Sequence, residues 1–332
     1  MAIHRVAVLG LGLIGGSLLL RLAADQASSP GSPGSIGYDA DPETRAAVAQ
    51  RLGPSAVAPD LAAAVDGADL VVLAVPLPAV PIVVAALRDV GYRGLLTDVT
   101  SVKEPVRAIV TAELPDARWV GGHPMAGKEA SGFDVADPEL LAGCAWALCL
   151  DNGTALADWL DVARWVLGLG GRVTPLTAIE HDAAVARISH LPHLVAAALT
   201  TGAAAEPVGP AALGLAAGSF RDATRVAATR AALTAAMCGG NAAALITELD
   251  SLVERLEEAR ELLTTTDPVS ALTGWLETAR AIRHEWPPHG AETRTPLTRH
   301  DLLALGRAGG WLTELHADAA TAVLPKSVHP PT

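Results

Sequence analysis

Cysteine is scarce in this chain, and long apolar runs are missing. The three cysteines, Cys144, Cys149 and Cys238, include no Cys-x-x-Cys pair, so they predict no disulfide framework and agree with a reducing cytosol. No apolar run reaches the roughly 18 residues of a membrane-spanning helix. Residues 1–5 do not begin the charged and apolar order of a signal peptide. We therefore expect a cytoplasmic protein with no membrane partner.

Positive charge is also in short supply. The 332 residues carry 24 Lys and Arg against 36 Asp and Glu, a net charge of −12 at pH 7. Because non-specific nucleic-acid binding depends on basic patches, we expect no nucleic-acid partner. Half of the residues are hydrophobic, so the chain can bury a large core. Its length suits two domains of ordinary size.

A glycine-rich turn follows the first predicted strand. Residues 5–9 are apolar and β-branched, and the next residues read Gly-Leu-Gly-Leu-Ile-Gly before an Ala/Leu-rich helical pattern. In this strand–turn–helix context, Gly-x-Gly-x-x-Gly is typical of dinucleotide binding. The first glycine permits the turn, the second lets the pyrophosphate approach, and the third allows close helix–strand packing. The expected cofactor contacts here are Gly10, Gly12, Leu13, Ile14 and Gly15.

An acidic residue ends the second predicted strand. Asp39 follows residues 35–38, at the position where a carboxylate binds the adenosine ribose hydroxyls and repels a 2′-phosphate. No cation stands at the next two positions, so the pattern favours NAD over NADP. The alternative role, capping the following helix, suits Asp41 better.

Further βα alternation predicts a Rossmann-type domain over residues 1–175. The run at 69–75 is almost continuously apolar, which is typical of a central parallel strand. Strands are also expected at 94–98, 118–120, 145–150 and 172–175. We expect three strand-end residues to face the cofactor as well, namely Val75, Pro76 and Asp98.

One histidine stands where the fifth of these strands ends. The stretch from Trp119 reads Trp-Val-Gly-Gly-His-Pro-Met-Ala-Gly-Lys-Glu, which predicts a strand that empties into a tight loop. Open α/β sheets bind ligands at the carboxyl ends of their strands. His123 is therefore a candidate catalytic residue; the alternative is a histidine in an ordinary turn.

Long helical patterns replace the alternation after residue 176. One helix is expected at 177–205, kinked by Pro192, and an amphipathic, dimer-forming one at 234–263. We assign 176–285 to an all-helical substrate and dimerisation domain and expect a homodimer. The tail at 286–332 predicts one helix and at most one strand, too little for a regulatory domain. The histidines of the first helix lack His-Glu-x-x-His spacing, so no metal site is expected.

Six motifs in unbroken order resemble the prephenate/arogenate dehydrogenases of tyrosine biosynthesis. The likeness covers about residues 5–265, and the motifs lie at residues 10–17, 98–103, 122–129, 181–182, 189–193 and 220–225. It implies NAD-dependent oxidative decarboxylation of prephenate to 4-hydroxyphenylpyruvate.

The resemblance also implies roles for individual residues. His123 would take the proton of the ring 4-hydroxyl, and Ser101 would orient His123 and that hydroxyl. Arg225 would bind a substrate carboxylate, and His193 the side-chain end. Lys128 and Glu129 would lie at the mouth of the site. A neutral imidazole suits proton removal from a carbinol, and a guanidinium suits a carboxylate.

The sequence leaves the substrate open. Arogenate, or an amino-deoxyprephenate of a specialised pathway, differs from prephenate by one amino group. Glu129 could pair with that amine, whereas Lys128 argues against it. Some family members carry Gly where this chain has Thr100, and an aromatic near Thr234. A β-hydroxyacid dehydrogenase needs a lysine that residues 176–199 lack, and a non-catalytic NAD sensor leaves Ser101, His123 and Arg225 unexplained.

Overall fold

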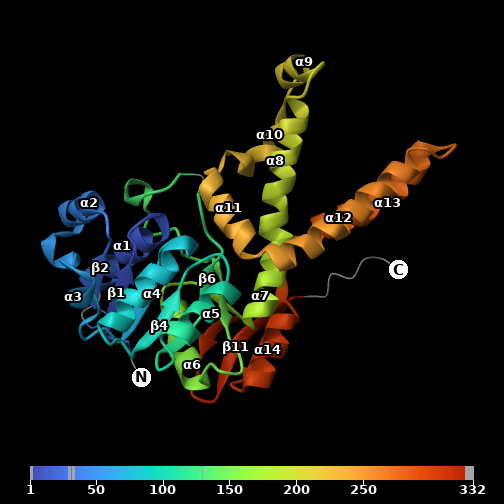
Figure 1. The fold of residues 1–332 in the computed structure, drawn as a ribbon. Coiled ribbons are helices and arrows are strands. Elements are labelled where there is room, and N and C mark those ends of the chain that lie inside the picture. The colour runs from blue at the N-terminus through green and yellow to red at the C-terminus, as the bar shows by residue number, and fades with distance from the viewer. Residues whose placement is uncertain (1–2, 29–30, 32–33, 129, 326–332) are drawn as a thin grey trace.

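The computed structural model describes residues 3–28, 31, 34–128 and 130–325. Two sheets and a projecting set of helices make up the fold (Figure 1). The first sheet is parallel, with strand order β2-β1-β3-β4-β5. Its strands are β1 (Arg5–Leu9), β2 (Gly34–Tyr38), β3 (Leu70–Leu73), β4 (Leu95–Asp98) and β5 (Arg118–Val120).

Helices cover this sheet because both of its faces are apolar. Val6, Ala7 and Val8 are all fully buried, although they alternate between faces, as expected of a central parallel strand. The connecting elements are α1 (Leu13–Ser28), α2 (Pro42–Leu52), η1 (Pro54–Ala56), α3 (Leu61–Val65), η2 (Leu77–Ala79), α4 (Val80–Asp89) and α5 (Glu104–Glu113). The predicted Rossmann-type sheet is confirmed.

The second sheet joins residues from both ends of the chain, in the order β6-β7-β8-β10-β11-β9. The first three strands come from the N-terminal domain, and the last three from the tail. Its elements, with intervening helices, are β6 (Gly122–Pro124), η3 (Phe133–Val135), β7 (Ala145–Cys149), α6 (Leu156–Gly168), β8 (Arg172–Leu176), β9 (Gly290–Pro296), α14 (Arg299–Arg307), β10 (Trp311–Leu315) and β11 (Ala319–Pro325).

The tail is therefore more extensive than the sequence predicts. It holds the expected helix but three strands in place of one, and they extend the second sheet rather than form a separate unit (red in Figure 1). Gly306 lets α14 lie directly on β8, because a Cβ there would sit 1.7 Å from the carbonyl oxygen of Pro175. Leu312 and Ala322 are fully buried in the common core.

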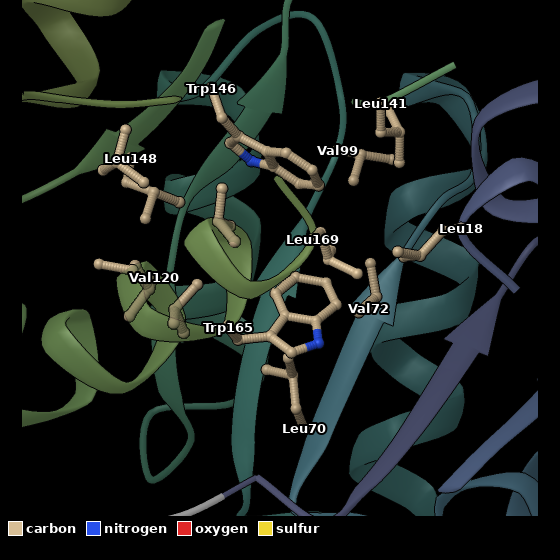
Figure 2. Packing of buried hydrophobic residues seen from close by; sticks show 14 of the residues in the cluster. Leu18, Leu70, Val72, Val99, Val120, Leu141, Trp146, Leu148, Trp165 and Leu169 are labelled. Atoms are coloured by element: carbon tan, nitrogen blue, oxygen red, sulfur yellow. The ribbon is translucent and has the colours of Figure 1, made fainter. Parts of the chain in front are cut away.

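Tryptophans fill the core where the two sheets meet. The rings of Trp146 on β7 and Trp165 on α6 contact edge to face, with centroids 6.0 Å apart and an interplanar angle of 72° (Figure 2). Leu70 and Val72 of the first sheet belong to the same cluster. Burial of such large rings contributes several kcal/mol in total, by the rule of about 25 cal/mol per Å². One core therefore supports both sheets.

The remaining helices project from the sheets (Figure 1). The helix predicted at 177–205 is interrupted by a π-helical turn just before Pro192, which is a recognised cause of a bend. The prediction of one continuous helix at 234–263 is wrong, because two helices, α11 and α12, cover this range and meet at 93°. The helices are α7 (Ala178–Val185), the π-turn η4 (Ala186–His190), α8 (Leu191–Ala203), α9 (Gly209–Gly214), α10 (Gly218–Thr224), η5 (Arg225–Ala228), α11 (Ala231–Gly240), α12 (Ala242–Leu262) and α13 (Pro268–Glu285).

Gly240 lets the last residues of α11 lie against the first domain. A Cβ at this position would lie 2.4 Å from Leu77 Cδ2 of the first domain, so glycine allows the helix to contact the loop after β3.

Within the described residues, no single helix is long and apolar enough to cross a membrane. The pair α11–α12 satisfies length and composition jointly, but with the 93° bend.

Candidate active site

The glycine-rich turn between β1 and α1 has the geometry that the motif predicts. Gly10 has a φ of +97°, which favours glycine. A Cβ on Gly15 would lie 1.9 Å from the carbonyl oxygen of Gly10, so this glycine permits the close packing of helix on turn. Gly12 has no atom within 4 Å of a Cβ position, which leaves room for a ligand. Together with the amides at the start of α1, this turn fits a dinucleotide pyrophosphate.

A cavity of about 720 Å³ opens over this turn. Its wall runs from the first sheet to α8 and α11, so both domains contribute to it. This volume lies within the range of small-molecule and cofactor sites. Among the predicted site residues, those on the wall are Gly10, Gly12, Leu13, Ile14, Asp39, Val75, Pro76, Ser101, Lys128 and His193.

Asp39 fixes the conformation of the turn. Its Oδ2 accepts a hydrogen bond of 2.7 Å from the Leu11 amide, and its Oδ1 accepts one of 2.9 Å from the Asp41 amide. The carboxylate still lines the cavity, where it can meet a ribose. Asp41 caps α2 through the amides of Glu43 and Thr44, as the sequence predicts.

The structure corrects the prediction for Asp98. Its side chain is fully buried and forms an ion pair with Lys103, instead of facing the cavity. Thr100 Oγ1 also donates to it at 2.5 Å. The Lys103 ammonium also donates hydrogen bonds to Thr100 Oγ1 (3.0 Å) and to the carbonyl oxygen of Gly122 (2.6 Å). A buried ammonium needs such partners. Asp98 therefore neutralises Lys103, and Lys103 in turn holds β6, the strand of His123, through the Gly122 carbonyl.

His123 lies on strand β6 rather than in the predicted loop. It pairs with Ala147 of β7 and is 9% exposed. Its Nδ1 lies 2.9 Å from Nε2 of His181, whose Nδ1 lies 2.8 Å from Oδ1 of Asp182. The hydrogen-bond partner of His123 is thus His181, whereas the family resemblance implies Ser101. Ser101 lines the cavity, whereas His123 is not among the residues that line it.

Burial lowers the pKa of His123 well below its ordinary value of 6.5. Repulsion lowers this pKa further, from the Lys103 ammonium and from any positive charge on His181 or His190. Its imidazole is therefore neutral at pH 7, the form that accepts a proton. Sequence reasoning attached no role to Lys103, His181 or Asp182. The signals were present, because Lys103 is one of three lysines and all three residues belong to motifs of the family resemblance.

The helical domain closes the other side of the cavity. His193 on α8 lines it, and the nearby charge of Arg225 lowers the pKa of His193 after the larger effect of burial. Arg225 itself begins η5 and is exposed. Arg230, which sequence reasoning missed, lines the cavity and donates to Ser131 Oγ at 3.2 Å.

The predicted mouth residues are only partly described. Lys128 lines the cavity and pairs with Asp137 at 3.2 Å. Glu129 lies outside the described residues.

Over the described chain, no group of three or more His, Cys, Asp or Glu side chains is arranged to hold a metal ion. His190 is fully buried and accepts a hydrogen bond from Asn241 Nδ2 at Nδ1, over 3.1 Å.

Known proteins resemble both parts of this arrangement. Residues 32–175 match the family model of the prephenate dehydrogenase nucleotide-binding domain, and residues 177–278 match that of the prephenate dehydrogenase dimerisation domain. The cyclohexadienyl dehydrogenase of Zymomonas mobilis is 35% identical over 281 residues, which cover 83% of this chain and 94% of that protein. The chain belongs to the prephenate dehydrogenase family.

Other members of the family agree with this assignment. The prephenate dehydrogenase of Bacillus subtilis is 30% identical, over 84% of this chain and 75% of that protein. The crystal structure of Synechocystis arogenate dehydrogenase has a TM-score of 0.72 at 28% identity, covering 85% of this chain and 99% of that one. Prephenate dehydrogenase from A. aeolicus, in complex with hydroxyphenyl propionate and NAD+, shares the fold with a TM-score of 0.76 at 24% identity, covering 86% and 99%.

Family membership makes the chain an oxidoreductase of the prephenate, arogenate and cyclohexadienyl dehydrogenase group. Its nucleotide-binding domain and the open space at Gly12 support a nucleotide cofactor. The predicted fold class, a Rossmann-type domain followed by helices that belong to a dimerisation domain, is confirmed.

Proposed function

We propose that this enzyme is an NAD-dependent prephenate dehydrogenase that forms 4-hydroxyphenylpyruvate, carbon dioxide and NADH. The observation that carries the proposal is His123, a buried and neutral imidazole. Its neighbour Gly122 is joined through the Lys103 ammonium to Thr100, which lines the cavity over the dinucleotide-binding turn. Hydride leaves a carbinol carbon only as its hydroxyl proton is removed, so a neutral base at this place suits the reaction.

The residues of the chain would act on the two ends of the substrate. His123 takes the proton of the ring hydroxyl, and Ser101 on the cavity wall orients that hydroxyl. Arg225 and His193 hold the carboxylate-bearing side chain, which fixes the ring in position. The bound cofactor supplies the hydride acceptor.

Decarboxylation then follows without a further protein group. The bond from the ring to its carboxylate breaks, and the electron pair enters the ring as it becomes aromatic. The ring oxygen gains negative charge and recovers the proton from His123, so the base is regenerated. Atoms and charges balance when prephenate and NAD+ give 4-hydroxyphenylpyruvate, carbon dioxide and NADH.

Asp39 supports the choice of NAD. Its carboxylate lines the cavity and is held by the amides of Leu11 and Asp41, so a 2′-phosphate of NADP would meet a fixed negative charge. This preference belongs to the proposal.

Arogenate is the second candidate substrate. A cyclohexadienyl dehydrogenase and an arogenate dehydrogenase are both similar to this chain. Lys128 favours prephenate, because a cation at the mouth repels an amine; its pairing with Asp137 weakens that effect. An amino-deoxyprephenate of a specialised pathway stays a third candidate on the same grounds.

The test is a comparison of NADH or NADPH formation with prephenate, arogenate and an amino-deoxy analogue, each with NAD and with NADP. The proposal predicts the highest kcat/KM for prephenate with NAD. A higher value for arogenate would transfer the assignment to that substrate. No reduced cofactor with any combination would refute the proposed function.

We also propose that the enzyme is a homodimer. The family model of its helical domain describes a dimerisation domain. Exposed apolar side chains on α12 support this, at Ile246, Leu249, Val253, Leu256 and at Leu263 just beyond it. Their spacing of three, four and seven residues places them on one face of the helix.

A further inference from the structure

We infer that His181 and Asp182 fix the tautomer of His123, so that Nε2 of His123 is the nitrogen that receives the substrate proton. The inference rests on the proposed function for the identity of that proton, but the tautomer itself is a property of the protein alone. His181 and Asp182 are positioning residues in this account, since they act through His123.

Asp182 anchors the chain of hydrogen bonds as an acceptor. Its Oδ1 accepts from the Lys103 amide at 2.8 Å, and its Oδ2 accepts from the Glu104 amide at 2.9 Å. Both amides belong to the start of α5, where the helix dipole favours a negative charge. Burial raises the pKa of Asp182, but the His181 hydrogen bond and these amides outweigh it, and the pKa is lowered. The carboxylate is therefore ionised and has no proton to donate.

The next link follows from the chemistry of imidazole. Because Asp182 can only accept, His181 Nδ1 must carry a hydrogen and donate it across the 2.8 Å contact. His181 is almost completely buried, and burial lowers its pKa below 6.5, so the ring is neutral at pH 7. A neutral imidazole has one N–H. Its Nε2 is consequently an acceptor.

His123 is then fixed in turn. The only way to satisfy the 2.9 Å contact between His123 Nδ1 and His181 Nε2 is for His123 Nδ1 to donate its hydrogen. His123 is neutral as well, so its Nε2 carries the lone pair. The result is a base that presents its unprotonated nitrogen away from the His181–Asp182 pair.

The surrounding charges keep this arrangement poised. Burial and the Lys103 ammonium disfavour a positive charge on His123, while Asp98 compensates Lys103 through their ion pair. When His123 Nε2 takes the proton, the imidazolium Nδ1–H still donates to His181, and the chain ends at the Asp182 carboxylate. The positive charge formed during the reaction therefore meets an oriented acceptor without any side chain moving.

The direct test reads the tautomer rather than the activity. Histidine-selective ¹⁵N labelling with two-bond proton–nitrogen correlation spectra distinguishes Nδ1–H from Nε2–H imidazole, and His123→Asn assigns the signals by difference. We expect the Nδ1–H tautomer for His123 in the wild-type protein without substrate at pH 7.5. A wild-type His123 in the Nε2–H form would overturn the inference, whatever the substrate proves to be.

Two substitutions of His181 give the functional counterpart. His181→Leu removes the acceptor and should mix or reverse the tautomer, with kcat falling roughly 10²-fold or more and KM for NAD within about twofold. His181→Gln can still accept from His123 and donate to Asp182, so it should retain kcat within roughly tenfold.

Val185→Ala is the matched control, because Val185 is buried one turn further along α7. This substitution removes buried methyl groups and so weakens the packing of α7, but it leaves the chain of hydrogen bonds intact. Equal effects of His181→Leu and Val185→Ala on kcat and on the His123 spectrum would reduce His181 to a packing residue and refute the inference. If the wild-type protein shows the Nδ1–H tautomer but does not turn over prephenate, only the proposed function is refuted.

Discussion

His190 shows how burial of one residue becomes a property of the whole protein. It is fully buried, accepts the Asn241 amide at Nδ1, and burial lowers its pKa from 6.5 to about 4. Between these pH values the unfolded chain binds more protons than the folded one. The stability that His190 contributes is complete above pH 6.5 and is lost as the pH falls toward 4.

His190→Gln should therefore make the decline in stability between pH 6.5 and 4 shallower. Glutamine can still accept from Asn241, but it does not titrate in this range. Urea unfolding of both proteins at several pH values measures the difference in slope. His284→Gln, at an exposed site on α13, should leave the slope unchanged. Parallel curves for wild type and His190→Gln would show that His190 does not contribute.

At the scale of elements, the turn between β1 and α1 separates two uses of glycine. Gly15→Ala places a Cβ 1.9 Å from the Gly10 carbonyl oxygen, whereas Gly12→Ala meets no atom within 4 Å. We expect Gly12→Ala to keep the wild-type melting temperature but to weaken NAD binding at least tenfold, because its methyl group occupies the space for the pyrophosphate. Gly15→Ala should lower both the melting temperature and the affinity for NAD.

Calorimetric unfolding and NAD titration of the two variants provide the measurement. Wild-type NAD affinity in Gly12→Ala would mean that the pyrophosphate lies elsewhere. An unaltered melting temperature in Gly15→Ala would contradict the packing geometry.

Sequence patterns predict elements well where they are local. The glycine motif after residues 5–9 and the apolar run at 69–75 each carry their signal within a few residues, and both elements form as predicted. β9 carries no such signal, because its residues Gly290–Pro296 are mostly polar and its ladder partner, β11, lies some 30 residues further on. Long-range pairing of polar edge strands leaves little trace in hydrophobic periodicity.

The same limit applies to the site. The sequence identifies His123 as a candidate, since it follows a predicted strand at the end where open α/β sheets bind ligands, but it does not show which atoms contact its ring. His181 is 58 residues away, and Asp98 turns inward because Lys103 is buried beside it. Only the packing of α7 and α5 against the sheet edge determines these contacts.

At the scale of the molecule, two sheets with one core hold the cofactor turn and His123, while the projecting helices bring His193 and Arg230 to the cavity (Figure 1). The apolar face of α12 is exposed in the single chain: Val253 is 45% and Leu256 57% accessible. An exposed stripe of this length is costly in water, which is why we propose that a second copy covers it.

Val253→Asp combined with Leu256→Asp should therefore produce a monomer of near 34 kDa, the mass of one chain, in sedimentation velocity. Wild type should sediment as a dimer. Asp250→Ala with Glu254→Ala changes the neighbouring face of α12 and should leave the dimer intact. A wild-type monomer, or a dimer that survives both aspartates, would contradict the proposed interface.

The most direct test of the account is the turnover of His123→Asn at saturating prephenate and NAD. Asparagine keeps a polar side chain on β6 but cannot take up a proton. The account predicts that kcat for NADH formation falls roughly 10²-fold to 10⁴-fold, as expected for loss of a general base, while the Kd for NAD stays within about twofold. Wild-type turnover in His123→Asn would contradict the role of His123 as the base.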